Sequence, residues 1–306
     1  MKIITVTLNP CIDKSAEIDE IRIGGLNRLL DLNSHLGGKG YCVSRTLANL
    51  GGESIAMGFI SDEIKEIGFA GEFVKISSLR VNLKVISNGI LTEFSEQGKV
   101  NVEERDELFK KIKSKIAPGD LVAVMGSLPN GIKPKQALKL LLDIKAAGAS
   151  LFLDADGEFL KLGILAKPDY LKPNAVELCE FLDIKNEEEL INLINSNAEL
   201  LRQRLGKRAK LITVSLGASG AYFITPNETL YFPALPITVR NTAGAGDAMS
   251  AAICYSVLHN LELKETARLA MATSAAACMT IGTLPPSKTE IEKLKNLKEF
   301  NKVNKK

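Results

Sequence analysis

Arg240-Asn241-Thr242-Ala243-Gly244-Ala245-Gly246-Asp247-Ala248-Met249-Ser250-Ala251 is the stretch that says most about the fold and chemistry of this chain. Its glycines and aspartate stand where a loop turns into a run of small residues, which predicts a helix over residues 248–258. The backbone N–H groups of Gly244, Ala245 and Gly246 and the positive helix end would then form an anion hole. Asp247, at the first turn, could accept the proton of an attacking hydroxyl group. The pattern indicates phosphoryl transfer to an alcohol, with a tight loop capped by its aspartate as the alternative.

Short apolar runs alternate with amphipathic helical stretches along the whole chain, as in a parallel sheet that is covered on both faces. The expected strands are 3–8, 55–59, 121–125, 150–153, 170–172, 211–215 and 221–224. The further expected helices are 40–50, 103–116, 134–147, 175–182, 187–205 and 264–279. The fold class predicted is α/β with a mostly parallel sheet, in a single domain over residues 1–306.

Two segments, 15–36 and 74–94, have a different pattern. Apolar residues alternate with polar ones at a period of two and no helix intervenes, as at Ala16, Ile18, Ile21 and Ile23 and again at Val81, Leu83 and Val85. This pattern predicts antiparallel strands that pair with each other, inserted within the domain.

Composition excludes several classes of function. The 306 residues are 45% hydrophobic, enough for a large core, and 39 basic and 36 acidic residues leave no basic field for nucleic acid. Five scattered cysteines form neither metal spacing nor a disulfide framework, which favours reduced thiols in a cytoplasmic protein. The start of the chain has no signal-peptide pattern, and no apolar run reaches the roughly 18 residues of a membrane span, so no membrane partner is expected.

The loop at 240–251 is the last of five motifs. The others, in chain order, are Asn9-Pro10-Cys11-Ile12-Asp13, Gly37-Gly38-Lys39-Gly40, Lys172-Pro173-Asn174 with Glu177, and Ser215-Leu216-Gly217-Ala218-Ser219-Gly220. In this order they resemble the ribokinase-like (PfkB) carbohydrate kinases over roughly the whole chain. The Asn-Pro-x-Ile-Asp start most closely resembles the branch of 1-phosphofructokinases and tagatose-6-phosphate kinases.

The resemblance implies a three-layer α/β/α fold whose lid strands clasp those of a second copy in a homodimer. It also implies transfer of the γ-phosphate of ATP to a ketohexose phosphate. Fructose 1-phosphate, giving fructose 1,6-bisphosphate, is the favoured substrate, and tagatose 6-phosphate is the alternative.

On the sugar side, the resemblance assigns Asp13 to the sugar hydroxyls. Lys39 and Arg80 are expected to grip the phosphate that the substrate already carries, because arginine suits bidentate contact with phosphate. The further substrate-binding residues implied are Gly37, Gly38, Cys42, Asn82, Ser127 and Arg28. Arg28 is expected in the first lid strand.

On the nucleotide side, Asn174 and Glu177 stand at i and i+3 of a helix start and so point the same way. The resemblance gives this pair to Mg²⁺, partly through water, which suits a cation that keeps several of its waters. Lys172 would neutralise phosphate charge. The expected lining of the nucleotide groove is Ser215, Gly217, Gly220 and Thr242.

Three departures from the family pattern bear on substrate choice. Cys42 stands where an asparagine that binds sugar hydroxyls is usual, the stretch 58–81 is about a dozen residues short, and Asp154-Ala155-Asp156-Gly157 replaces Asp-Thr-Ser-Gly. A non-catalytic sugar-phosphate or nucleotide sensor, and a kinase for an unphosphorylated sugar or nucleoside, therefore stay open. A dinucleotide-dependent oxidoreductase does not, because no Gly-x-Gly-x-x-Gly follows the first strand.

Overall fold

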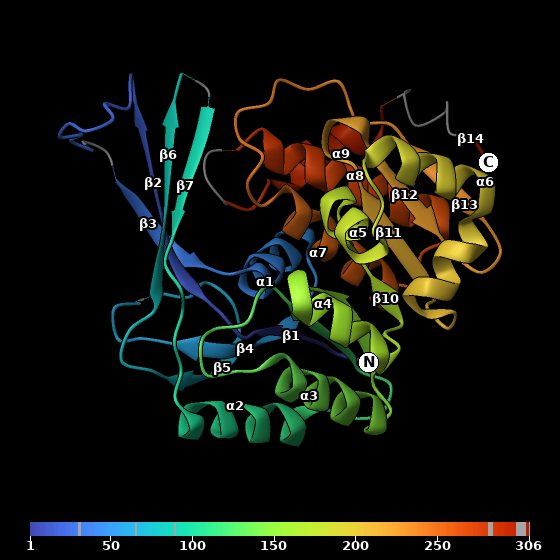
Figure 1. The fold of residues 1–306 in the computed structure, drawn as a ribbon, viewed down its shortest axis with the longest axis horizontal. Helices are drawn as coiled ribbons and strands as arrows, with labels where there is room; N and C mark the ends of the chain where they lie inside the picture. The colour runs from blue at the N-terminus through green and yellow to red at the C-terminus, as the bar shows by residue number, and fades with distance from the viewer. Residues whose placement is uncertain (30–31, 65, 89, 281–283, 298–303, 306) are drawn as a thin grey trace.

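A ten-stranded sheet forms the centre of the protein (Figure 1). The computed structural model describes residues 1–29, 32–64, 66–88, 90–280, 284–297 and 304–305. In spatial order the strands are β14 (Asn304–Lys305), β13 (Thr229–Phe232), β12 (Ala221–Ile224), β11 (Leu211–Ser215), β10 (Tyr170–Leu171), β9 (Ser150–Asp154), β8 (Leu121–Met125), β1 (Ile3–Thr7), β4 (Ser54–Ile60) and β5 (Gly71–Lys75). From β5 to β11 neighbouring strands are parallel, and from β11 to β14 they are antiparallel.

The central strands are buried on both faces, as their unbroken apolar sequences predict. Every residue of β1 and of β8 is buried. All seven expected strands are present, but β5, β13 and β14 were not predicted. β5 is a five-residue strand at the sheet edge in which only Val74 is buried, so it lacks the apolar run that marked the others.

Helices cover both faces of the sheet and divide the core in two (Figure 1). One face carries α1 (Lys39–Leu50), α7 (Ala245–Leu258), α8 (Leu263–Cys278) and α9 (Lys288–Lys295). The other carries α2 (Val102–Lys115), α3 (Pro134–Ala146), α4 (Gly157–Gly163), α5 (Ala175–Leu182) and α6 (Glu187–Gly206). The expected helices are confirmed, the one at 248–258 beginning three residues earlier; α4 and α9, of seven and eight residues, are additional.

The lid is a four-stranded sheet beside the main body, in the order β3 (Asn33–Gly37), β2 (Cys11–Ile18), β6 (Arg80–Ser87), β7 (Ile90–Ser95). The two predicted segments do pair with each other. The outer pairs β2–β3 and β6–β7 are antiparallel as expected, but the central pair β2–β6 is parallel. β2 and β6 both begin at the main body and run outward (Figure 1), which makes a parallel pairing the one available.

Parts of the predicted lid segments are not lid strands. Ile21 and Ile23 were expected to continue the first strand, but β2 ends at Ile18 and a loop follows. Gly24, at φ 78°, turns the chain there, and Ile23 is 99% exposed. At the start of the second segment, Val74 belongs to β5 of the main sheet.

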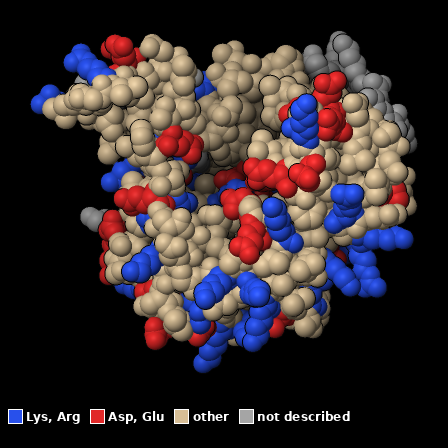
Figure 2. Space-filling model, in the orientation of Figure 1, with Lys and Arg blue, Asp and Glu red and all other residues tan. Residues whose placement is uncertain are grey.

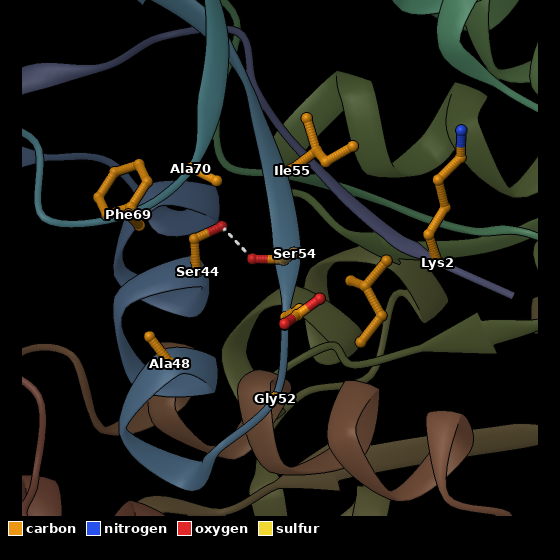
Figure 3. A pocket seen from close by; sticks show the side chains of 10 residues that line it. Lys2, Ser44, Ala48, Gly52, Ser54, Ile55, Phe69 and Ala70 are labelled. Carbon is orange, nitrogen blue, oxygen red and sulfur yellow. Dashed lines mark hydrogen bonds between the residues drawn. The ribbon is translucent and has the colours of Figure 1, made fainter.

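A pocket of about 490 Å³ lies at the end of the sheet where β1 and β4 begin (Figure 3). α1 contributes Ser44 and Ala48, and Phe69 and Ala70 close one side. The Ser54 hydroxyl donates to the Ser44 hydroxyl at 2.9 Å across it. The strand ends that carry the sequence motifs lie at the opposite edge. No helix in the described parts of the chain is both long and apolar enough to cross a membrane.

Gly38, the N-cap residue of α1, packs closely against the chain after β1. It has φ 119°, and a Cβ there would lie 2.7 Å from Thr7 Cγ2 and 3.2 Å from Pro10 Cα. We expect Gly38→Ala to lower the free energy of unfolding by about 2 to 4 kcal/mol, because backbone strain and a clash add together. Urea denaturation measures the loss. Gly24→Ala is the control: its φ is also positive but its Cβ meets nothing within 4 Å, so it should lose only about 1 kcal/mol. Equal losses would contradict the clash.

Candidate active site

The predicted anion hole lies at the start of α7. Gly244 is the N-cap in the left-handed conformation, with φ 82°, and no side chain caps the helix. Ala245 N–H donates weakly to the Thr242 carbonyl at 3.3 Å. In the first turn of a helix the N–H groups have no partner within the helix, so those of Gly246 and Asp247 are available to an anion.

The loop before α7 is tied to the end of α8. The N–H groups of Arg240 and Asn241 both donate to the Cys278 carbonyl, at 2.9 and 3.2 Å. Asn241 Oδ1 accepts from Ala243 N–H at 3.0 Å. These bonds hold the loop without using the first-turn N–H groups of α7.

Asp247 lines the pocket at the third residue of α7. Loss of solvent raises the pKa of its carboxyl group to about 6, although the charge of Lys39 acts in the opposite direction. The charge of Asp154 adds to the rise. A carboxylate with this pKa is largely ionised at pH 7 and still basic enough to accept a proton during a reaction.

A buried carboxylate, that of Asp154 at the end of β9, organises the charges around Asp247. Asp154 Oδ1 accepts from Lys39 Nζ at 2.9 Å, and Oδ2 lies 2.9 Å from Lys172 Nζ. The hydroxyl of Ser250 on α7 also donates to Oδ2, at 2.9 Å. Burial alone would raise the pKa of Asp154, but Lys172 and Lys39 hold it well below its usual range. Burial alone would lower the pKa of Lys39, but the charges of Asp154 and Asp247 raise it.

The residues predicted for the nucleotide line one pocket of about 570 Å³. They are Lys172, Asn174, Glu177, Ser215, Gly217, Gly220 and Thr242, together with Ala245, Gly246 and Asp247 of the anion loop. Lys39 lines it too. The rest of the wall was not predicted and is mostly apolar, with Leu235, Ile237, Val239, Met249, Met271 and Ala275. Figure 2 shows the hollow between the lid and the main body, with acidic side chains at its rim.

Asn174 and Glu177 form a reciprocal cap at the start of α5. Asn174 Oδ1 accepts from Glu177 N–H, and Glu177 Oε2 accepts from Asn174 N–H, each at 2.9 Å. Burial raises the pKa of Glu177 against the opposing charge of Lys39. The capping bonds hold both side chains rigidly in the pocket and occupy one carboxylate oxygen, Oε2. In the described residues no three His, Cys, Asp or Glu side chains are grouped to hold a metal ion.

Asp13, which the sequence predicts to bind the sugar hydroxyls, lies at the base of the lid on β2. Its Oδ1 accepts from Asn82 Nδ2 at 2.9 Å and lies 3.2 Å from Lys84 Nζ. Burial would raise the pKa of Asp13, but Lys84 and the bond from Asn82 lower it. Asn82 Oδ1 is buried and has no hydrogen-bond partner among the described residues, so it is an acceptor without a donor.

Gly37 and Cys42 lie close to Asp13. A Cβ on Gly37 would collide with Asp13 Oδ2 and lie 2.9 Å from Cys11 Sγ, so only glycine allows this approach. Cys42 is buried on α1. Burial, and then the charges of Asp247 and Asp13, raise the pKa of its thiol, which places Cys42 within electrostatic reach of both carboxylates.

Two predicted residues, Lys39 and Arg80, do not share a set of partners. Lys39 is bonded to Asp154, as described, whereas Arg80 Nε donates to the Asn9 carbonyl at 3.3 Å and Nη1 to Ser95 Oγ at 2.7 Å. Ser127 lies on the Arg80 side, accepting from Asn9 Nδ2 at 2.9 Å. The two side chains thus have different partners, and the joint grip of Lys39 and Arg80 on one phosphate stays a prediction.

Arg28 lies outside any lid strand. It was expected in the first lid strand, but it stands in the loop between β2 and β3 and is exposed. The side chain of Asn27 closes this loop, with Oδ1 accepting from Arg22 N–H at 2.8 Å. This bond and the glycines before it bend the chain away from a strand.

Three residues of the site were missed from the sequence: Lys84, Asp154 and Asn9. Lys84 lies two residues after Asn82 on β6, so strand alternation puts both on the same face, a signal that was present. Asp154 ends a buried strand at the carboxyl edge of the sheet, where ligands bind in open α/β folds. Asn9 gave no signal beyond its place in the first motif.

Comparison with known proteins bears on this site. A model of the pfkB family carbohydrate kinases matches residues 6–290. The chain belongs to the pfkB family. It is therefore a kinase that transfers phosphate to an alcohol group of a carbohydrate, and membership implies ATP as the donor. The expected three-layer, ribokinase-like fold is confirmed.

Named relatives of this pfkB chain cover nearly its whole length. It is 27% identical to 1-phosphofructokinase of Vibrio cholerae over 293 residues, 92% of this chain and 90% of that protein. It is 29% identical to 1-phosphofructokinase of Bacillus subtilis over 294 residues, 91% and 93% of the two chains. Phosphofructokinase-2 from Escherichia coli, in complex with substrates and products, superposes with a TM-score of 0.86 at 25% identity, covering 96% and 98% of the chains.

The raised pKa of Asp247 predicts the pH dependence of this pfkB kinase. If Asp247 must be ionised to accept a proton, kcat/KM should rise with pH between 5 and 7, with its midpoint near 6. Because the charge of Lys39 lowers this pKa, Lys39→Met should move the midpoint of the remaining activity to higher pH. Glu177→Gln is the control and should lower the rate without moving the midpoint. A midpoint below pH 5 in the parent would show that another group titrates.

Proposed function

We propose that the protein is an ATP-dependent sugar-phosphate kinase that acts on a ketohexose phosphate, with fructose 1-phosphate, giving fructose 1,6-bisphosphate, as the favoured substrate. The observation that carries the proposal is Asp247, a carboxylate of pKa about 6 at an anion-binding helix start, facing two lysines held by one buried aspartate. The names of the two curated relatives, both 1-phosphofructokinases, support the choice of sugar.

The proposed reaction is direct, in-line transfer. The free primary hydroxyl of the sugar forms a bond to the γ-phosphorus, the bond from that phosphorus to the bridging oxygen of ADP breaks, and Asp247 takes the hydroxyl proton. The first-turn N–H groups of α7 stabilise charge on the transferring group. Lys39 and Lys172, both beside Asp247 in the pocket, neutralise phosphate oxygens. No covalent enzyme intermediate is needed.

Mg²⁺ fits the donor set of the pocket. The capping bonds leave Glu177 Oε1 as a hard oxygen ligand that faces the pocket. Asn174 keeps the carboxylate in place through its own backbone and side chain. A small number of protein ligands is enough for Mg²⁺, because this cation takes most of its coordination shell from water and phosphate oxygens. When bound, Mg²⁺ would neutralise charge on the ATP phosphates.

For the phosphate that the substrate already carries, we propose Arg80 and Lys84 rather than Arg80 and Lys39. Arg80 and Lys84 lie at alternate positions of β6, so both project from the same face of the strand as Asn82. Lys84 is 7% exposed and neutralised by Asp13. A phosphate would compete for its ammonium and free Asp13 for the sugar hydroxyls, with Asn82 Oδ1 as an acceptor for another hydroxyl.

The main alternative within the family is a kinase for a different acceptor. The observation that favours it is Cys42, a buried thiol within electrostatic reach of Asp13 and Asp247, since a thiol is a weaker hydrogen-bond donor than an amide. Tagatose 6-phosphate is the second candidate substrate.

A substrate screen with one variant tests the function. ADP release is measured with fructose 1-phosphate, fructose 6-phosphate, tagatose 6-phosphate and unphosphorylated sugars. Asp247→Asn should lower kcat by a factor of about 10² to 10⁴, the range for a positioned base, while MgATP binding stays nearly unchanged. Equal kcat in variant and parent would remove the catalytic role of Asp247. Absence of ADP release from the parent with every ketohexose phosphate would refute the proposed substrate class.

Substitution on β6 tests how the substrate phosphate is held. Arg80→Ala and Lys84→Ala should each raise KM for the sugar phosphate by about one to two orders of magnitude, since charge-assisted bonds contribute roughly 1.5 to 3 kcal/mol each. KM for ATP should change little. Lys75→Ala, at a lysine exposed to solvent and paired with exposed Asp62, is the control. A preference for an unphosphorylated sugar, with both variants harmless, would overturn the assignment.

We also propose that the lid joins two copies in a homodimer. Strand register puts Leu83 opposite Phe94 and Ser87 opposite Ile90, on the face of the lid away from Asp13 and Asn82. Phe94 is 57% exposed and Ile90 69%. A thin sheet with exposed apolar side chains favours a partner.

Sedimentation tests the dimer. The parent should sediment as a dimer at micromolar concentration, and Phe94→Glu should shift it to monomer because a charge would be buried at the interface. Glu93→Gln, on the opposite face of the same strand, should stay dimeric. A monomeric parent would argue against a lid-mediated pair.

A further inference from the structure

Ser250 lies on the same side of α7 as Asp247, three residues further along the helix. It is fully buried, and its hydroxyl donates to Asp154 Oδ2 at 2.9 Å. The carbonyl oxygen of Gly246 lies 3.1 Å from the same hydroxyl. A hydroxyl has one proton, so the two acceptors share it and Ser250 connects them.

Asp154 receives polar groups from three parts of the fold. Lys39 comes from the start of α1, Lys172 directly follows β10, and Ser250 lies on α7. The bond from Ser250 is therefore a direct polar link between the helix that carries Asp247 and the carboxylate that holds both lysines. Other buried residues of α7, such as Ala248 and Ala252, contribute packing, which fixes a position less sharply than a hydrogen bond to a charge.

We propose that Ser250 is a positioning residue that ties the first two turns of α7 to Asp154. The tie sets the distance of Asp247 and of the Gly246 N–H group from the ammonium groups of Lys39 and Lys172. Ser250 acts through Asp154 and needs no contact with substrate. The inference rests on the proposed kinase reaction, because it concerns alignment of the base, the anion hole and the lysines around one phosphoryl group.

The same helix offers a matched control in Ser256. It is 1% exposed, and its hydroxyl donates to the Ala252 carbonyl, four residues back, at 2.8 Å. This bond is the counterpart of the one between Ser250 and Gly246, but it lies at the far end of α7. Substitutions at Ser256 therefore reproduce the loss of a buried helical hydroxyl without touching Asp154.

The test compares Ser250→Cys and Ser250→Ala with Ser256→Cys and Ser256→Ala. Cysteine nearly keeps the volume of serine but is a weak donor, so it removes the bond without leaving a cavity. We expect kcat to fall about tenfold in both Ser250 variants, the effect of losing a bond to a charged group. KM for the sugar phosphate should stay within about twofold, and the thermal midpoint should match that of the Ser256 variants. Equal kcat in the two sets would overturn the proposal.

A double-mutant cycle tests the route through Asp154. In an Asp154→Asn background, Ser250→Cys should lower kcat by less than about twofold, because the charged acceptor is already gone. A full tenfold fall there would show that Ser250 acts by another route. If Asp154→Asn does not fold, as judged by circular dichroism, the comparison with Ser256 decides alone.

Failure of the proposed kinase function can be distinguished from failure of the proposed role of Ser250. A parent that turns over no sugar phosphate would refute the kinase proposal, and titration with a fluorescent ATP analogue and Mg²⁺ would still test Ser250. Ser250→Cys should then bind the nucleotide about threefold or more weakly than Ser256→Cys, since the lysines and the anion hole no longer align. Equal affinities would overturn the role of Ser250.

Discussion

The buried carboxylate of Asp154 is the constraint on which the rest of the site depends. A carboxylate that is 1% exposed is costly unless ionic and hydrogen-bonding partners satisfy it. Here Lys39, Lys172 and Ser250 meet that demand from three separate elements. Because this buried charge needs partners, the ammonium groups of Lys39 and Lys172 and the α7 helix all lie around the Asp154 carboxylate. Asp154 also affects the pKa of Asp247. It holds Lys39 in place, and the charge of Lys39 lowers the pKa that desolvation raises.

Sheet topology explains why residues far apart in the chain reach that point. β1, β8, β9, β10 and β11 are parallel neighbours, so their carboxyl ends meet at one edge. β1, β10 and β11 are each followed or ended by one of the polar motifs, and β9 ends at Asp154. The helices that begin there, α1, α5 and α7, direct their first turns to the same edge, which is where N–H groups and helix dipoles favour phosphate. The opposite edge carries the pocket of Figure 3 and none of these motifs.

The lid has two chemically different faces because its strands pair in a definite register. Asp13, Asn82 and Ser95 are in register on one face, and Lys14, Leu83 and Phe94 on the other. A slip of one residue would exchange the faces. The polar face carries Asp13 and Asn82, which are proposed to bind the sugar, and the other face leaves Phe94 and Ile90 exposed, which is the basis of the proposed dimer.

The sequence by itself determined the class of fold and most of its elements. β8, β11, β12 and α5 have the predicted bounds, since unbroken apolar runs and capping patterns record local burial directly. The polar lining of the 570 Å³ pocket could also be named, because its residues lie in motifs at strand ends and helix starts. Short or exposed elements such as β5, β13 and α9 carry too little periodicity to be predicted.

Only the tertiary structure decided which side chains meet. Lys39 and Asp154 are 115 residues apart in the chain, and nothing in the local sequence predicts that they pair. The parallel pairing of β2 with β6 depends on where both strands leave the main body, which period-two alternation does not encode. Ser250 carries no sequence signal beyond a small residue in a helix of small residues. Its proposed role rests on a bond that exists only when α7 is packed against the end of β9, since the choice of partner across a core is set by packing and not by local pattern.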